Sequence, residues 1–291
     1  MSSVKVSVII PTYKSWDLLK KCLDALSIQT YSQPFEILVV NNDSNHNIPE
    51  ELNKFKNVIF LQEFKAGSYA ARNTAIQFST AEILAFTDAD CIPDKDWLTN
   101  GIALLQSTPE IGIVAGNVKL FYKDEKNLTP AEMFDKHTAF RIKEYVHFGN
   151  CVTANWISYR KTIVDFGCFD SDLKSGGDTK LSQTISQTKK IIYGENVIVL
   201  HPARYEIKEI ITKYRRIIGG RYIEKFKKLQ NIKFLSSVID MIYRRLKFNL
   251  NFLRKGQFEV FFKILIVNIF LCPSLLLEAF RIIRTGKTER K

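Results

Sequence analysis

The first half of the chain alternates short apolar runs with segments of helical periodicity. The apolar runs, rich in β-branched residues, occupy residues 4–10, 37–40, 58–61 and 83–86, and the helical segments include 17–28, 68–78 and 97–105. These runs lack alternating polar residues, which is typical of strands covered on both faces. The order predicts βαβ units that form a doubly wound, largely parallel α/β sheet.

The rhythm loosens after residue 110. We expect strands over 111–118, 152–158 and 196–200, with helices over 131–145 and 160–166 and another after Gly177. Beyond residue 204 the sequence is helical and basic to its end. We therefore predict an α/β domain over 1–204 and a helical region over 205–291.

Excess positive charge is confined to the last third of the chain. The sequence has 42 Lys and Arg against 30 Asp and Glu. Residues 1–204 hold 22 basic and 23 acidic side chains, whereas residues 205–291 hold 20 and 7. A nearly neutral body with a basic extension predicts an anionic partner for the extension, either a membrane surface or a nucleic acid.

Polar residues follow three of the predicted strands. Ligands of open α/β sheets bind at the carboxyl ends of the strands, so these positions form the expected site. They are Pro11, Thr12 and Tyr13 after the first strand, Asn41, Asn42 and Asp43 after the second, and Asp88 and Asp90 after the fourth. Turn-forming residues also follow strands for conformational reasons alone, but three clusters on one rim favour a binding site.

The Asp88-Ala89-Asp90 triplet is the most specific of these clusters. Two carboxylates separated by one residue can hold Mn²⁺ or Mg²⁺, and the cation then binds the oxygens of a diphosphate. The chain has no GxxxxGK[ST] loop and no GxGxxG after the first strand, which disfavours a P-loop NTPase or a dinucleotide oxidoreductase.

Four motifs in order resemble one known family. VSVIIPTYKSWDLLKKCLDALSIQT, EILVVNNDS, GSYAARNTAI and ILAFTDADCIPDKDWL are similar to the nucleotide-sugar half of family 2 glycosyltransferases. NCVTANWISYRKTIVDFGCFDSDLKSGGDTKL resembles the acceptor half of the same family. The resemblance implies a GT-A fold built on a doubly wound mixed sheet, with a nucleotide-sugar half over 1–118 and an acceptor half over 119–204.

The resemblance also implies roles for particular residues. Donor-binding positions would be Pro11, Thr12, Tyr13, Asn41, Asn42, Asp43, Gly67, Arg72, Asp88 and Asn155, and the metal would be held by Asp88, Asp90 and His201. Many relatives have Asp-Asp-Gly where this chain has Asn41-Asn42-Asp43. The usual carboxylate contact to a uracil N–H would then be made by an amide side chain or by Asp43, so the resemblance does not identify the nucleobase of the donor.

Asp178 is the candidate catalytic base. A hydroxyl is a poor nucleophile at neutral pH, and a carboxylate within hydrogen-bond reach can take its proton as the new bond forms. Without the resemblance, Asp178 after Gly176-Gly177 would be an ordinary residue capping a helix. The chain has Gly177 where many relatives have Glu, so a second carboxylate must come from elsewhere, with Asp172 as one candidate.

The C-terminal region combines basic clusters with an uncharged run, Ile264–Leu277. Fourteen helical residues span ~21 Å, which is less than the ~30 Å hydrocarbon core, so we expect no complete crossing. Basic residues interleaved with aromatic ones are typical of helices at an anionic membrane interface. Plain packing helices and a nucleic-acid groove are the less favoured alternatives.

The leading prediction is an inverting, metal-dependent glycosyltransferase of surface polysaccharide synthesis. It would move one sugar from a nucleotide-sugar donor to a lipid-linked or glycan acceptor, and a UDP-sugar is the expected donor. The N-terminus resembles no secretory signal, and we expect the enzyme on the cytoplasmic face of the cytoplasmic membrane, bound to no nucleic acid. The alternatives are a nucleotidyltransferase and a non-catalytic membrane or nucleic-acid adaptor.

Overall fold

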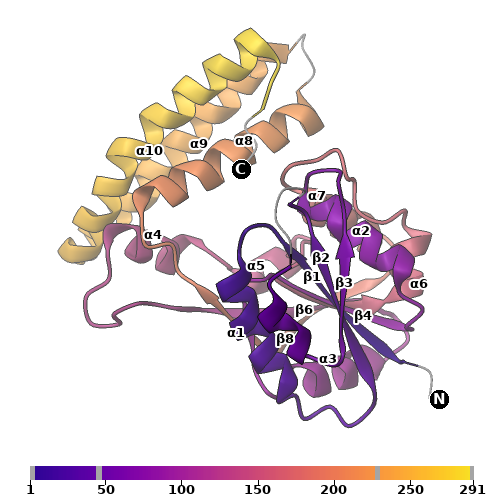
Figure 1. Cartoon of the computed structure of the whole chain (residues 1–291). Helices are drawn as coiled ribbons and strands as arrows, with labels where there is room; N and C mark the ends of the chain where they lie inside the picture. Colours follow the sequence, from indigo (N-terminus) through magenta and orange to yellow (C-terminus); the bar gives the residue numbers. More distant parts are fainter. Residues whose placement is uncertain (1–3, 44–47, 227–229, 289–291) are drawn as a thin grey trace. The chain divides into compact units, whose positions relative to one another are not determined.

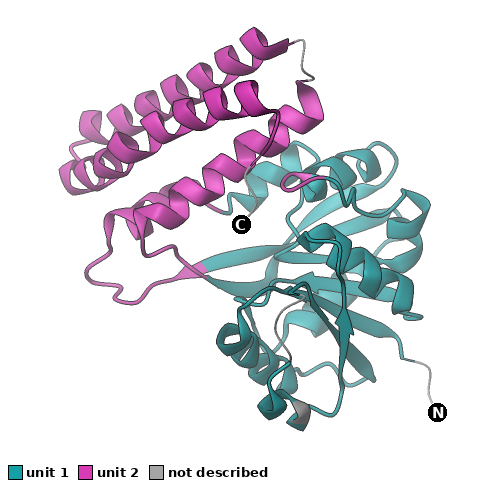
Figure 2. Ribbon diagram, turned by 45° about the horizontal axis from the view of Figure 1, so that its top comes forward, with its two compact units in different colours: residues 1–119, 140–172, 177–201 teal, residues 120–139, 173–176, 202–291 magenta. Residues whose placement is uncertain are grey.

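The computed structural model describes residues 4–43, 48–226 and 230–288, which fall into two compact units. Unit 1 comprises residues 1–119, 140–172 and 177–201, and unit 2 comprises residues 120–139, 173–176 and 202–291 (Figure 2). These units reflect contacts within the fold. The functional division into 1–204 and 205–291 stays a prediction.

Unit 1 is built on an eight-stranded mixed sheet with the order β3-β2-β1-β4-β7-β6-β8-β5 (Figure 1). The strands are β1 Val6–Thr12, β2 Phe35–Asn41, β3 Val58–Gln62, β4 Ile83–Thr87, β5 Ile92–Pro93, β6 Ile111–Phe121, β7 Asn155–Tyr159 and β8 Lys190–Pro202. Strands β1 to β4 are parallel, whereas β7 runs antiparallel to β4 and β6, and β5 antiparallel to β8. The sheet is therefore mixed, which confirms the predicted fold class: the βαβ units of the first half are parallel, and antiparallel pairs join the second half.

Helices cover the sheet of unit 1 on both faces, with α1 and α3 on one face and α2 on the other (Figure 1). The helices of this unit are α1 Trp16–Ser27, the 3₁₀ helix η1 Glu50–Lys54, α2 Ser68–Phe78, α3 Trp97–Gln106, α5 Ile142–His147, α6 Arg160–Asp165 and α7 Gly177–Ile185. Helix α1 buries Leu19, Cys22, Leu23 and Leu26 at the predicted helical spacing. Because β1, β2 and β4 are buried between the two helical layers, their polar carboxyl ends are the part of the sheet left to bind a ligand.

The single helix predicted over 131–145 is two helices. Helix α4, Pro130–Thr138, begins with a capping box in which Thr129 and Glu132 satisfy each other's backbone N–H groups. Phe140 then adopts a left-handed φ of 49°, and α5 starts two residues later. A residue with a left-handed φ cannot continue a right-handed helix, so the helix is interrupted there.

Unit 2 is helical and has its own apolar core. It contains α4 together with α8 Ile207–Lys225, α9 Asn231–Arg254 and α10 Phe258–Thr285, and α10 packs against the other three. Its core includes Phe134, Ile218, Phe234, Val267, Leu271 and Leu275.

Helix α10 extends well beyond the uncharged run Ile264–Leu277. It has 28 residues, or about 42 Å at 1.5 Å per residue, because neither Lys263 nor Glu278 ends the helix. Among the described residues it is the one helix long and apolar enough to cross a membrane by length and composition, which is weak evidence by itself. The helix is thus longer than the uncharged run from which we expected no complete crossing, and that expectation stays a prediction.

Candidate functional site

The turn after β2 is held by its own amide side chains. Asn41 is buried; its Nδ2 donates to Gln62 Oε1 at 2.9 Å, and its Oδ1 accepts the backbone N–H of Asp43 at 3.0 Å. Asp43 is buried beside it. At the end of the neighbouring β1, Thr12 Oγ1 is buried and has no hydrogen-bond partner in the part of the chain that the structure describes, while Pro11 is half-buried and Tyr13 exposed. The structure thus brings the expected nucleoside-binding residues together at the ends of two adjacent strands.

Asn42 connects this turn to the start of α2. Its Nδ2 donates to the carbonyls of Glu63 and Lys65 at 2.8 and 2.9 Å, and its Oδ1 accepts the backbone N–H of Gly67 at 2.6 Å. Gly67 has a φ of 138°, which side chains with a Cβ rarely adopt, and it directly precedes α2. The glycine is therefore required by the backbone, and Asn42 fixes the loop that carries it.

Arg72 is an internal residue of unit 1 and not a solvated one. It is 3% exposed, its guanidinium forms an ion pair with Asp88 Oδ1, and it lies 5.9 Å from the ring centroid of Tyr69. Burial raises the pKa of Asp88, and the Arg72 charge opposes that rise. Arg72 thus supplies the counter-charge for the first carboxylate of the triplet.

The second carboxylate of the triplet faces β8. Asp90 Oδ2 lies 3.7 Å from Nε2 of His201, whose ring packs on Phe140 at a centroid distance of 4.7 Å. Single ligand atoms of Asp90, Cys91 and His201 all lie within 4.8 Å of one another. The carboxylate oxygen suits a hard cation such as Mn²⁺ or Mg²⁺ and the imidazole nitrogen can add a second ligand, while the cysteine sulfur suits softer metals. Asp90 and His201 therefore form the candidate metal site, with Asp88 held by Arg72.

Asp178 lies at the start of α7 and is oriented by two donors. Its Oδ1 accepts the hydroxyl of Tyr69 at 3.0 Å and the backbone N–H of Thr179 at 2.9 Å. Tyr69 is buried and stacks on Phe169 at 5.7 Å, and burial followed by the Asp178 charge raises the pKa of the phenol, which therefore stays a donor at neutral pH. Tyr69 also lies 5.9 Å from the guanidinium of Arg72, which pairs with Asp88, so a chain of side-chain contacts connects Asp178 to the triplet.

Tyr69 is a residue that the sequence analysis did not single out. It lies in the GSYAARN segment, three residues before Arg72, and contacts both Arg72 and Asp178. The one sequence signal that could have identified Tyr69 is its place in that motif, because its partner Asp178 is distant along the chain.

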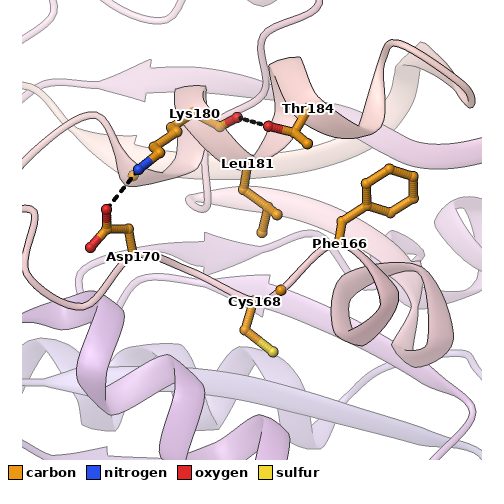
Figure 3. A pocket seen from close by; sticks show the side chains of 8 residues that line it. Phe166, Cys168, Asp170, Lys180, Leu181 and Thr184 are labelled. Atoms are coloured by element: carbon orange, nitrogen blue, oxygen red, sulfur yellow. Dashed lines mark hydrogen bonds and ion pairs between the residues drawn. The ribbon is translucent and has the colours of Figure 1, made fainter. Parts of the chain in front are cut away.

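A cavity of about 320 Å³ opens beside α7 (Figure 3). Lys180 and Asp170 form an ion pair of 2.8 Å at its edge. Its wall combines these charges with apolar and hydroxyl side chains: Phe166, Gly167, Cys168, Asp170, Gly177, Lys180, Leu181 and Thr184. Gly177 of this wall precedes Asp178 in the sequence, so the cavity adjoins the segment that carries the candidate base.

Asn155 is fully buried at the start of β7. Its Oδ1 accepts the indole N–H of Trp97 at 2.8 Å, and its Nδ2 donates to the carbonyls of Asn117 and Val197 at 3.0 and 2.8 Å. These contacts tie α3, β6 and β8 to β7. Its donor-binding role stays a prediction, and the contacts observed are structural.

The chain belongs to glycosyl transferase family 2. The model of that family, "Glycosyl transferase family 2", matches residues 7–165, which is more than half of the chain. The matched residues include the polar ends of β1, β2 and β4, the Asp88-Ala89-Asp90 triplet, and α2, which carries Arg72. Membership decides the enzyme class in favour of a glycosyltransferase over a nucleotidyltransferase or a non-catalytic adaptor.

Individual relatives support the same conclusion. Glycosyltransferase AglE of Haloferax volcanii is 35% identical over 224 residues, which are 74% of this chain and 72% of AglE. WfgD of Escherichia coli, named a UDP-Glc:alpha-D-GlcNAc-diphosphoundecaprenol beta-1,3-glucosyltransferase, is 28% identical over 36% of this chain and 40% of its own length. For WfgD, then, the likeness spans less than half of the relative.

The fold is that of a solved GT-A enzyme. The structure of mannosyltransferase PcManGT from Pyrobaculum calidifontis, determined with GDP-Man and Mn²⁺, matches this chain with a TM-score of 0.63 and 20% sequence identity. The match covers 99% of this chain and 89% of the PcManGT chain. The predicted GT-A fold is confirmed.

Proposed function

We propose that this chain is an inverting, metal-dependent glycosyltransferase that moves one sugar from a nucleoside-diphosphate donor to a hydroxyl of a lipid-linked or glycan acceptor during surface polysaccharide synthesis. One observation carries the proposal: a single compact unit contains both the Asp90–His201 pair at the end of β4 and Asp178, oriented by Tyr69 at the start of α7. UDP-sugar is the expected donor.

The donor end of the site depends on Asp90, His201, Arg72 and Thr12. Asp90 and His201 would hold Mn²⁺ or Mg²⁺, and the bound cation supplies positive charge for the leaving diphosphate. Arg72 pairs with Asp88 and opposes the rise in its pKa that burial causes. Thr12 Oγ1, buried without a hydrogen-bond partner among the described residues, is available to the nucleoside.

At the acceptor end Asp178 acts as general base. Tyr69 and Thr179 both donate to Oδ1, which fixes the carboxylate and leaves Oδ2 to take the proton of the acceptor hydroxyl. A single displacement of this kind inverts the anomeric configuration. The cavity beside Gly177 is the proposed location of the acceptor glycan.

Thermal stabilisation by nucleotides tests the donor and metal assignments together. A bound ligand raises the unfolding temperature by mass action. UDP should stabilise the wild-type protein with Mn²⁺ and not with excess chelator, and Asp90→Asn and His201→Gln should each remove the Mn²⁺-dependent part. Asp165→Asn, which changes an exposed carboxylate on α6, is the control and should behave as wild type. Equal stabilisation with and without chelator would refute the metal site.

We further propose that residues 205–291 hold the enzyme on the anionic cytoplasmic face of the membrane. Support comes from their net charge of +13, from the apolar length of α10, and from the relative WfgD, whose name includes a diphosphoundecaprenol acceptor. Binding to vesicles of phosphatidylcholine with phosphatidylglycerol should exceed binding to phosphatidylcholine alone and weaken at high salt. No binding to either vesicle would contradict the proposal.

A further inference from the structure

Cys91 places a thiol beside the Asp90–His201 pair. It directly follows the Asp88-Ala89-Asp90 triplet, its side chain is fully buried, and its backbone N–H donates to the carbonyl of Asp88 at 3.0 Å. The thiol sulfur lies 4.0 Å from Asp90 Oδ1, and the other carboxylate oxygen, Oδ2, lies 3.7 Å from His201 Nε2. A sulfur, an oxygen and a nitrogen donor thus adjoin one another after the end of β4.

The spacing of these three donors is close to that of a zinc site. Ligand atoms of Asp90, Cys91 and His201 all lie within 4.8 Å of one another. A tetrahedral Zn²⁺ with bonds of ~2.0–2.3 Å holds its ligand atoms ~3.3–3.6 Å apart. The donors therefore need to approach one another by at most ~1.5 Å to share one cation. Rotation of the Asp90 side chain, which is 36% exposed, can supply much of that movement.

The type of cation decides whether the sulfur is used. Mg²⁺ and Mn²⁺ prefer oxygen ligands, whereas thiolate, imidazole and carboxylate together are usual ligands of Zn²⁺. A cation such as Mn²⁺ on Asp90 and His201 would leave Cys91 as a neutral thiol. Zn²⁺ would replace the thiol proton, so that Cys–SH and Zn²⁺ give Cys–S–Zn and H⁺ without any change of oxidation state.

We propose that Cys91 is a third ligand that lets the Asp90–His201 pair bind Zn²⁺ in place of Mn²⁺, and that Zn²⁺ bound in this way inhibits donor binding. Charge is the reason for the inhibition. A divalent cation on one carboxylate keeps a net positive charge for a diphosphate, and a thiolate ligand cancels that charge. The zinc site is independent of the proposed function, but its inhibitory effect rests on that function.

Cobalt(II) absorption tests whether the sulfur is a ligand. Co²⁺ accepts the same ligands as Zn²⁺, and a bound thiolate gives it an intense near-ultraviolet charge-transfer band. The full chain titrated with Co²⁺ should show this band, added Zn²⁺ should abolish it, and Cys91→Ser should lack it. Cys272→Ser is the matched control, because Cys272 is a half-buried cysteine of α10, and it should keep the band. A band that survives in Cys91→Ser, or no band in wild type, would refute the ligand role of Cys91.

Metal affinities separate ligation from packing. In competition with a chromogenic chelator, Cys91→Ser should bind Zn²⁺ at least about ten-fold more weakly than wild type. Its affinity for Mn²⁺ should change less than about two-fold, because Mn²⁺ does not use the sulfur. An equal loss of both affinities would make the buried thiol a packing residue and overturn the proposal. Cys91→Ala, which buries no hydroxyl, repeats both measurements if Cys91→Ser fails to fold.

UDP binding measures the inhibitory effect. In equilibrium dialysis with Mn²⁺, added Zn²⁺ should weaken UDP binding to wild type at least about ten-fold and to Cys91→Ser less than about two-fold. Unchanged UDP binding by a protein that shows the Co²⁺–thiolate band would contradict the inhibition. If UDP binds neither protein with Mn²⁺, the proposed function fails, and the Co²⁺ band still decides the zinc site by itself.

Discussion

The two units bury their apolar side chains to different extents. In unit 1 the strands β1, β2 and β4 are buried almost throughout, and the exposed large apolar residues are scattered. In unit 2, α10 carries one apolar stripe in the core and a second stripe that is exposed. Phe270 and Leu271 illustrate the contrast, since the first is 55% exposed and the second 0%.

The exposed stripes of unit 2 follow helical spacing. On α10 they contain Phe258, Phe262, Ile266, Ile269, Phe270, Leu277 and Phe280, and on α9 Ile232, Ile239, Tyr243, Leu246, Leu250 and Leu253. Exposed apolar side chains gathered this way mark an interaction surface, whereas scattered ones need no explanation. Unit 1 therefore buries most of its large apolar side chains within its own core. Unit 2 leaves two apolar stripes exposed, and such stripes are suited to an interface.

Replacing the candidate base should have the largest effect on activity. Asp178→Asn keeps the size of the side chain and a hydrogen-bonding oxygen but cannot take the acceptor proton. We expect sugar transfer to fall by ~10² to 10⁴ in turnover, while Mn²⁺-dependent UDP binding survives. Asp172→Asn, an exposed carboxylate paired with Lys65, is the comparison variant. Wild-type turnover in Asp178→Asn, or an equal loss in Asp172→Asn, would reassign the base.

Unit 1 should be sensitive to loss of one buried amide. Asn155→Ala leaves the indole N–H of Trp97 and two backbone carbonyls without partners, so we expect a loss of about 2–4 kcal/mol in the free energy of unfolding by denaturant. Asn100→Ala removes a hydrogen bond to the carbonyl of Asn196 that is exposed to water, and it should cost less than about 1 kcal/mol. Similar losses for both would show that burial does not decide the cost.

Local patterns predicted much of the fold of unit 1. The helix 68–78 is observed at its expected bounds, and each apolar run became a strand. The two-residue strand Ile92–Pro93 is too short to produce a pattern. The break at Phe140 was missed because nothing in its residue type signals a left-handed φ.

Pairings between distant residues could not be read from local patterns. The strand-end rule placed the polar turns at one rim, but it could not tell that Arg72 pairs with Asp88. Only the family resemblance grouped His201 with Asp90, and the structure places their side chains 3.7 Å apart. Such contacts depend on the order of strands in the sheet, in which β8 and β4 are not neighbours. The roles of these residues in catalysis stay predictions until the variants above are measured.

The charges around Lys213 in unit 2 predict a pH dependence of fold stability that unit 1 should not share. The pKa of Lys213 is about 8 in the folded state against 10.5 for an unperturbed lysine, with Arg204, Arg216, Arg245 and Asp135 as the charges around it. Between these pH values the unfolded chain binds the proton and the folded chain does not, so stability should rise as pH rises. Compared with Lys213→Met, wild type should gain ~1–3 kcal/mol from pH 8 to 10.5 in denaturant unfolding. Parallel pH profiles for the two proteins would contradict the lowered pKa.

The smallest expected effect tests the comparison of the two surfaces directly. Phe270 on α10 and Phe78 at the end of α2 are exposed to similar degrees, 55% and 50%, but only Phe270 belongs to a continuous apolar stripe. Phe270→Gln and Phe78→Gln should each change stability by less than ~0.5 kcal/mol, because neither side chain fills a core. If the stripe of α10 inserts into a bilayer, Phe270→Gln forfeits ~1 kcal/mol of apolar burial and should weaken vesicle binding about five-fold. Phe78→Gln should bind vesicles as wild type does. Equal vesicle affinity for the two variants would mean that the exposed stripe of α10 does not contact the membrane, and the surplus apolar surface would then belong to a protein partner.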